Sequence, residues 1–124
     1  MTTIAVIGLG SFGCRIVEEL IETQAELIIL DRDREIVEKY KNSVVNAYIT
    51  DAISEETLKK VIPLDINAAI VDLGSQLESS ILVTNHLIYM LYQLFSIHQK
   101  CSVLAFLHNT KHINIGSWRL PPSP

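Results

Sequence analysis

The sequence has no excess of positive charge, and this shortage excludes two classes of partner. Ten lysines and arginines stand against fourteen aspartates and glutamates, which gives a net charge of −4. A nucleic-acid-binding domain needs a basic face, and attraction to an anionic membrane surface needs clustered cations. We therefore expect the chain to bind no nucleic acid and no anionic membrane surface. We also expect no direct insertion into a membrane, because polar residues interrupt its most apolar run.

Cysteine and histidine are also scarce. Cys14 and Cys101 are far apart and lack metal-ligand spacing, so we expect free thiols in a reducing compartment. His108 and His112 are spaced as half of a metal site on a helix would be. The residues between them do not favour a helix and no third ligand is evident, so we expect no metal.

No catalytic set stands out. There is no serine–histidine–aspartate order, and no lysine at the end of an expected strand. A dehydrogenase also needs structure that holds its substrate against the nicotinamide, and we find none here. The most apolar run, 77–97, holds Glu78, Asn85, His86 and Gln93, which favours an amphipathic helix over a membrane span.

The chain does contain a strand, a glycine-rich turn and a helix at its start. The apolar run 4–7 is typical of a buried parallel strand. The G-x-G-x-x-G of Gly8, Gly10 and Gly13 follows, then a helix with apolar residues at 16, 17, 20 and 21. Gly8 permits the tight turn, Gly10 lets a pyrophosphate approach the backbone, and Gly13 lets the helix pack closely. Unpaired amides at the helix start favour an anion.

A second expected strand, 26–30, ends in Asp31. Asp31 follows Gly13 by 31 − 13 = 18 residues, close to the roughly 20 expected for a carboxylate that binds ribose hydroxyls. A carboxylate there also repels the 2′-phosphate of NADP. The alternative is that the three glycines only permit tight packing and that Asp31 caps the next helix.

Strands and helices alternate along the whole chain, which predicts an α/β fold. We expect strands over 3–7, 26–30, 44–49, 68–71 and 102–107, and helices over 11–22, 34–41, about 55–61 and 76–95, with Asp33 and Ser54 as N-caps. Right-handed crossovers then give a Rossmann-like, doubly wound parallel sheet in one domain, with strand order 3-2-1-4-5. Its crevice would gather the glycine turn, Asp31, Asp51 and Gly74.

Four segments in order resemble the nucleotide-binding half of RCK domains, also called KTN or TrkA-N. They are Val6 to Gly13, Leu30-Asp31-Arg32-Asp33, Thr50-Asp51-Ala52, and Val71-Asp72-Leu73-Gly74 with Glu78 to Ile81. The resemblance covers about residues 1–95. It implies that residues 1–108 form a TrkA-N domain, and we expect 109–124 to be an irregular C-terminal tail.

The resemblance implies a cytoplasmic regulatory subunit of a Trk- or Ktr-type potassium uptake system. Such domains form dimers and rings, and gate transport by binding NAD(H), ATP or ADP. The implied binding residues are Gly8, Gly10, Ser11, Phe12 and Gly13 for the phosphates, Asp31 for the ribose, Asp51 and Ala52 beside the adenine, and Gly74 opposite the glycine turn. Arg32, next to Asp31, is a further implied binding residue. The implied partners are a second copy of the chain, through the helix at 77–95, and a transporter subunit at the inner face of the membrane.

Two features depart from the family pattern. Ser11 replaces an arginine that many members have, which leaves discrimination between ATP and ADP open. Asp72 is either the cap of the following helix, which we prefer, or a ligand of a cation bound with the nucleotide. The competing hypothesis for the whole chain is a fragment or subunit of an NAD-dependent oxidoreductase.

Overall fold

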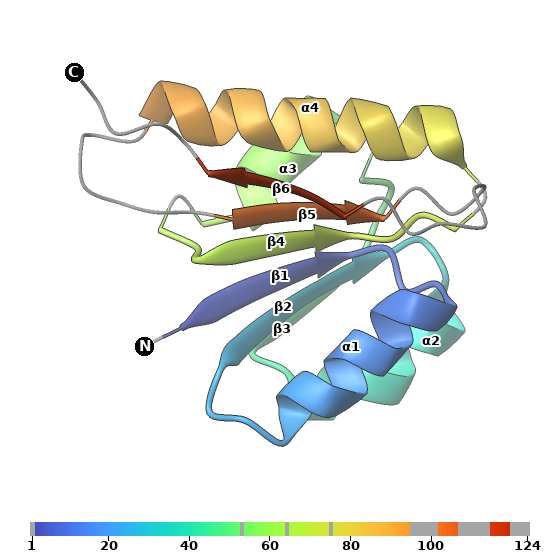
Figure 1. Cartoon of the computed structure of the whole chain (residues 1–124). Helices are drawn as coiled ribbons and strands as arrows, with labels where there is room; N and C mark the ends of the chain where they lie inside the picture. The colour runs from blue at the N-terminus through green and yellow to red at the C-terminus, as the bar shows by residue number, and fades with distance from the viewer. Residues whose placement is uncertain are drawn as a thin grey trace.

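The computed structural model describes residues 2–52, 54–63, 65–74, 76–94, 102–106 and 115–119. Strands and helices alternate along the chain (Figure 1). The elements are β1 (Thr3–Ile7), α1 (Ser11–Ile21), β2 (Glu26–Asp31), α2 (Arg34–Tyr40), the 3₁₀ helix η1 (Lys41–Ser43), β3 (Asn46–Ile49), α3 (Glu55–Val61), β4 (Ala68–Val71), α4 (Leu77–Leu94), β5 (Ser102–Phe106) and β6 (Ile115–Arg119).

The sheet has the parallel order β3-β2-β1-β4, which confirms the predicted α/β fold and the first four places of the predicted strand order. β1 is central, and its Ala5 pairs with Ile28 of β2 and Ala69 of β4. Beyond β4 the sheet continues with β5, parallel to β4, and β6, antiparallel to β5. The carboxyl ends of the parallel strands therefore meet at one edge, where ligands of such folds bind.

Helices cover both faces of the sheet, α1 and α2 on one and α3 and α4 on the other (Figure 1). Successive strand residues point to opposite faces. Val6 packs in a cluster with Val17 of α1 and Val37 of α2, whereas Ile7 packs in a second cluster with Leu87 of α4. All five side chains are at most 1% exposed. A strand buried on both faces explains the continuous apolar run at 4–7.

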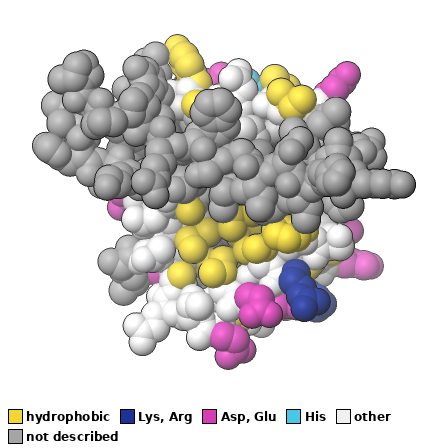
Figure 2. All heavy atoms as spheres, viewed as in Figure 1, with side chains coloured by type: hydrophobic (Ala, Val, Ile, Leu, Met, Phe, Trp, Pro, Cys, Tyr) yellow, Lys and Arg dark blue, Asp and Glu magenta, His cyan; other side chains and the backbone are white. Residues whose placement is uncertain are grey.

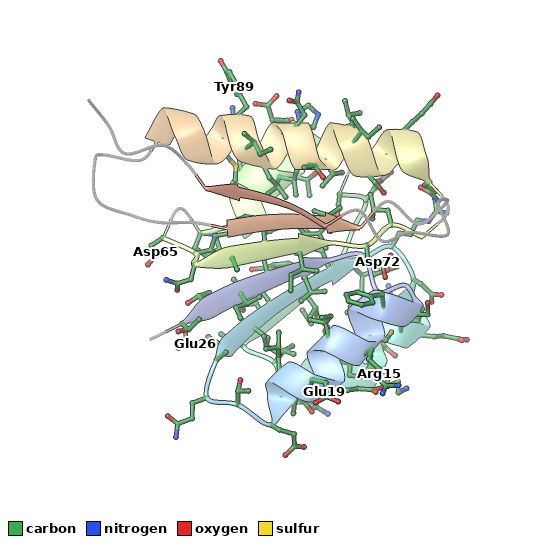
Figure 3. All side chains as sticks on the ribbon, viewed as in Figure 1. Arg15, Glu19, Glu26, Asp65, Asp72 and Tyr89 are labelled. Atoms are coloured by element: carbon green, nitrogen blue, oxygen red, sulfur yellow. The ribbon has the colours of Figure 1, made fainter. Side chains whose placement is uncertain are left out.

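The polar side chains of α1 lie on its outer face. Arg15 and Glu19 are exposed and point away from the sheet (Figure 3). Figure 2 shows hydrophobic side chains in the middle of the viewed surface and several charged side chains toward its lower edge. α1 is thus the amphipathic helix that its apolar spacing predicted.

Two predicted N-caps are confirmed. The Asp33 carboxylate accepts a hydrogen bond from the Glu35 amide at 3.0 Å, and the Ser54 hydroxyl accepts one from the Thr57 amide at 3.4 Å. The third strand is shorter than the predicted 44–49. The 3₁₀ turn η1 continues from α2, so pairing with β2 begins only at Asn46.

α4 packs one face on the sheet and leaves the other outside. Val83, Leu87 and Met90 are buried, and each such side chain contributes about 1.5–3 kcal/mol of hydrophobic stabilisation. Ile81 and Tyr89 are 53% and 56% exposed, and Tyr89 points outward (Figure 3). Within the described part of the chain, no helix has both the length and the apolar character needed to cross a membrane. Self-association through this helix stays a prediction.

A strand lies within the segment that we expected to be an irregular tail. β6 pairs antiparallel with β5, Gly116 opposite Ala105. Ile115 and Trp118 have β-branched and aromatic side chains that favour strands, and the pairing partner is not visible in the local sequence. Cys101, His108 and His112 lie outside the described residues. The division of the chain at residue 108 stays a prediction.

Candidate functional site

A cleft of about 250 Å³ opens at the carboxyl ends of β1, β2, β3 and β4. Its walls are the turns that follow these four strands. The lining residues are 8–10, 30–33, 36, 50–52, 72–74 and 76. The cleft therefore lies at the edge of the sheet where the sequence predicts a crevice.

The turn from β1 to α1 is held tightly between the two neighbouring strands. The Gly8 amide donates to the Leu30 carbonyl at 2.8 Å, and the Asp72 amide donates to the Ile7 carbonyl at 2.8 Å. Gly8 has φ +88°, and a side chain there would collide with the backbone oxygen of Asp72. Glycine is the one residue type that meets both conditions without strain.

The N-terminus of α1 points its first amides toward this turn. Gly10 is the N-cap residue and makes no side-chain cap, and Ser11 is exposed as the first residue of the helix. The Cys14 amide closes the first helical turn onto the Gly10 carbonyl at 2.9 Å. The first amides of a helix have no acceptor inside that helix and carry partial positive charge. The start of α1 at Ser11 is therefore the part of the site that suits an anion.

Asp31 joins the end of β2 to the glycine turn. Its Oδ2 accepts a hydrogen bond from the Leu9 amide at 2.6 Å, and its Oδ1 accepts one from the Asp33 amide at 2.8 Å. The two bonds fix the orientation of the carboxylate at the cleft wall. Since each carboxylate oxygen has a second lone-pair site, Asp31 can still accept hydrogen bonds from a ligand.

Asp72 joins the end of β4 to the same turn from the other side. The side chain is fully buried, and its Oδ2 accepts from the Gly13 amide at 2.7 Å. Its Oδ1 accepts from the Gly74 amide at 3.2 Å. Figure 3 shows Asp72 at the loop end of the sheet, beside the start of α1. One carboxylate thus connects the first helix to the turn that precedes α4.

This contact corrects our preferred role for Asp72. Asp72 caps α1, to which it is connected only in space, and not the helix that follows it in sequence. It also changes the reason for Gly10. A Cβ on Gly10 would lie 2.8 Å from Oδ2 of Asp72. On the side where a Cβ of Gly10 would lie, the space is therefore filled by the Asp72 carboxylate and is not open to a pyrophosphate.

The structure brings seven of the ten predicted binding residues to the cleft. They are Gly8, Gly10, Asp31, Arg32, Asp51, Ala52 and Gly74. Ser11 lies just outside the lining, Gly13 is buried against Asp72, and Phe12 packs against the apolar cluster under α1. The binding roles of all ten stay predictions.

Several lining residues were not predicted. Thr50, Ile36, Leu73 and Gln76 lie in the cleft wall because they neighbour predicted positions in the turns. Asp72 was considered but not placed in the site. Its position directly after a buried strand is the sequence feature that could have revealed it.

Other chemistry is not evident in the part of the chain that the structure describes. No group of three or more histidine, cysteine or acidic side chains there is arranged to hold a metal ion. The Cys14 thiol lies under the glycine turn and donates to the Leu9 carbonyl at 3.3 Å. Cys14 is therefore a small side chain that packs beneath the loop.

Comparison with known proteins identifies one family and two relatives. The TrkA-N domain family model matches residues 4–115. The Ktr system potassium uptake protein C of Bacillus subtilis (strain 168) is 36% identical over 80 residues, and the Ktr system potassium uptake protein A of Vibrio alginolyticus is 29% identical over 80 residues. Each match covers 64% of this chain and 36% of the relative. The matched part therefore spans about a third of the length of these relatives.

Proposed function

The chain belongs to the TrkA-N domain family, and from this premise we propose that it is the nucleotide-binding part of a regulator of potassium uptake. The proposed ligand is an adenine nucleotide, NAD(H) or ATP/ADP, whose binding is sensed and not followed by a reaction. The proposal includes the full doubly wound order 3-2-1-4-5 for a domain over 1–108. Both relatives are potassium uptake proteins by name.

The hydrogen bond between the Leu9 amide and Oδ2 of Asp31, at 2.6 Å, carries the proposal. It joins the loop that would hold phosphate to the carboxylate that would hold ribose. A ligand with a ribose and a phosphate five bonds or so apart needs these two groups side by side. An Asp31 that merely capped α2 would not need the contact with Leu9.

The residues at the cleft fit such a ligand in four parts. The glycine turn and the start of α1 at Ser11 would hold phosphate oxygens, although the Gly13 amide already donates to Asp72. Asp31 would accept from the ribose hydroxyls. Asp51 and Ala52 would border the adenine, and Gly74 would form the opposite wall. These assignments follow from which residues line the cleft and from the chemistry of each group.

Regulation would act through the geometry of an assembly. We propose that the chain forms at least a homodimer, through α4 and the neighbouring strand edge, and sits at the cytoplasmic face of the membrane on a transporter partner. A nucleotide would favour one arrangement of the assembly over another by its difference in affinity for the two. Ile81 and Tyr89 supply exposed apolar surface on α4 for this contact.

A thermal-shift comparison of NAD, NADH, NADP, ATP, ADP and AMP tests the proposed ligand class. A ligand at a hundred times its Kd adds about 2.7 kcal/mol, which raises the Tm of a domain of this size by roughly 5–15 °C. We expect such a shift from at least one adenylate and a smaller one from NADP. No shift with any of them would contradict the proposal.

The same comparison addresses the oxidoreductase alternative. A preference for a ligand without nicotinamide, such as ADP, would argue against an enzyme of hydride transfer. Light scattering of the purified chain tests the assembly separately. We expect the mass of a dimer or a larger ring, and a monomer at all concentrations would contradict that part of the proposal.

A further inference from the structure

Four acidic side chains surround the cleft, and one of them lies beneath the proposed phosphate seat. Asp31, Asp33, Asp51 and Asp72 all line it. Among the described lining residues, Arg32 is the one cationic side chain, and it follows β2, beyond the carboxylate of Asp31. The described lining of the cleft is therefore negative overall, which is unusual for a site that is to bind phosphates.

Asp72 is the one of these four acids that solvent shields least, because the other three are exposed or half-buried. It is fully buried, and none of the ion pairs in the described part of the chain involves it. Its hydrogen-bond partners are the Gly13 and Gly74 amides. The Gly13 amide belongs to the first turn of α1, and the amides of a first helical turn are the groups that attract anions.

The position of Asp72 therefore weakens the anion seat in two ways. The carboxylate uses an amide that a phosphate would otherwise take, and its full negative charge outweighs the partial positive charge of about one half at the helix N-terminus. The repulsion grows with the charge on the ligand. A terminal phosphate carries close to two negative charges at pH 7, whereas each phosphodiester of a dinucleotide carries one.

We propose that Asp72 makes this cleft select adenine nucleotides without a terminal phosphate, such as NAD(H) and ADP-ribose, over ATP. The inference rests on the proposed function and narrows its ligand class. Asp72 acts as a specificity-determining residue that works through charge and through the Gly13 amide. The binding contacts of the ligand itself are those of the glycine turn and Asp31.

Isothermal titration in EDTA with NAD, ADP-ribose, ADP and ATP tests the inference. The wild-type protein should bind NAD at least about tenfold more tightly than ATP, with ADP between them. Asp72→Asn removes the charge and keeps the shape. We expect it to lower the ratio of Kd for ATP to Kd for NAD about tenfold or more, since one unit charge in a partly buried site has an effect of this size.

Glu22→Gln is the matched control. Glu22 is exposed and is the C-cap residue of the same helix, so the substitution changes the net charge equally at the far end of α1. It should leave the ratio within about twofold of wild type. Asp72→Ala is a second variant that removes the charge, in case the asparagine amide clashes with the Gly13 or Gly74 N–H groups.

The outcomes are separable. A wild-type protein that binds ATP as tightly as NAD, or folded Asp72 variants with an unchanged ratio, would overturn the inference and leave the proposed function intact. A wild-type protein that binds no adenylate would overturn both. If neither variant folds, the ratio of Kd for ATP to Kd for NAD in the wild-type protein is the test of the inference.

Discussion

The backbone oxygen of Asp72 occupies the space where a side chain on Gly8 would begin. The two residues are 64 positions apart, and β1 and β4 bring them together through the hydrogen bond from the Asp72 amide to the Ile7 carbonyl. Gly8 also has φ +88°. The glycine turn is thus shaped by its neighbour strand as much as by its own sequence, and its most sensitive position is Gly8.

Substitution Gly8→Ala should destabilise the protein by roughly 2–4 kcal/mol. The new methyl group would collide with the backbone of Asp72 and push β1 and β4 apart. The alanine would also be strained at the positive φ of this position. Gly74→Ala is the matched control, since Gly74 has φ +65° but open space around the position of a Cβ. It should cost only about 1 kcal/mol. Urea unfolding of the two variants measures the difference, and equal losses would show that crowding at Asp72 is unimportant.

The buried side of α4 gives a second prediction. Leu87→Ala should lower the free energy of unfolding by about 2–5 kcal/mol, because Leu87 is fully buried between α4 and the sheet. Leu82→Ala, on the same helix at 44% exposure, should cost less than about 1 kcal/mol. Chemical denaturation of both variants provides the comparison. If Leu87→Ala lowered the free energy of unfolding no more than Leu82→Ala, α4 would not pack on the sheet as described.

The stretch of sequence that follows α1 shows what could be predicted and why. Asp33 and Ser54 were predicted as caps because a cap bonds to an amide two or three residues away, and both contacts are present. The parallel order of the first four strands was predicted from the alternation of strands and helices, and each strand or helix is recognised from its own residues. Each of these features depends on a short window of residues.

Features that depend on distant residues were missed or incomplete. The bond from Gly13 to Asp72 spans 59 residues, and nothing near Asp72 indicates which helix it caps. The hydrogen bond from Leu9 to Asp31 spans 22 residues. The motif predicted that the glycine turn and Asp31 belong to one site, but not that Leu9 contacts Asp31. β6 depends on β5 for its pairing, and this partner cannot be identified from the residues of β6 alone.

Tyr40 gives a prediction for alkaline pH. Its ring is 4% exposed and its hydroxyl donates to Oε1 of Glu18 at 2.7 Å. Burial, and then the hydrogen bond to Glu18, raise the pKa of the Tyr40 phenol above its ordinary value. A raised pKa means that the folded state holds the proton more firmly. This contribution to stability is complete below about pH 10, the pKa of an unfolded tyrosine, and is lost as the pH rises further.

Tyr40→Phe should therefore cost roughly 1–2 kcal/mol at pH 8 and should reduce the loss of stability above pH 10. Urea unfolding at a series of pH values measures both effects. Tyr89→Phe is the control, since Tyr89 is 56% exposed. Parallel pH curves for wild type and Tyr40→Phe would show that the phenol of Tyr40 does not titrate abnormally.

The central claim is that Asp31 and the glycine turn form one seat for an adenine nucleotide. Isothermal titration of wild type, Asp31→Ala and Asp65→Ala with the best ligand of the thermal-shift panel tests it directly. Asp65 is exposed and lies at the opposite end of the sheet (Figure 3), so Asp65→Ala should bind like wild type. Asp31→Ala should lose roughly tenfold or more in affinity, as expected when a charged hydrogen-bond acceptor is removed. Equal affinities for all three proteins, or no heat of binding from wild type at millimolar nucleotide, would contradict the claim.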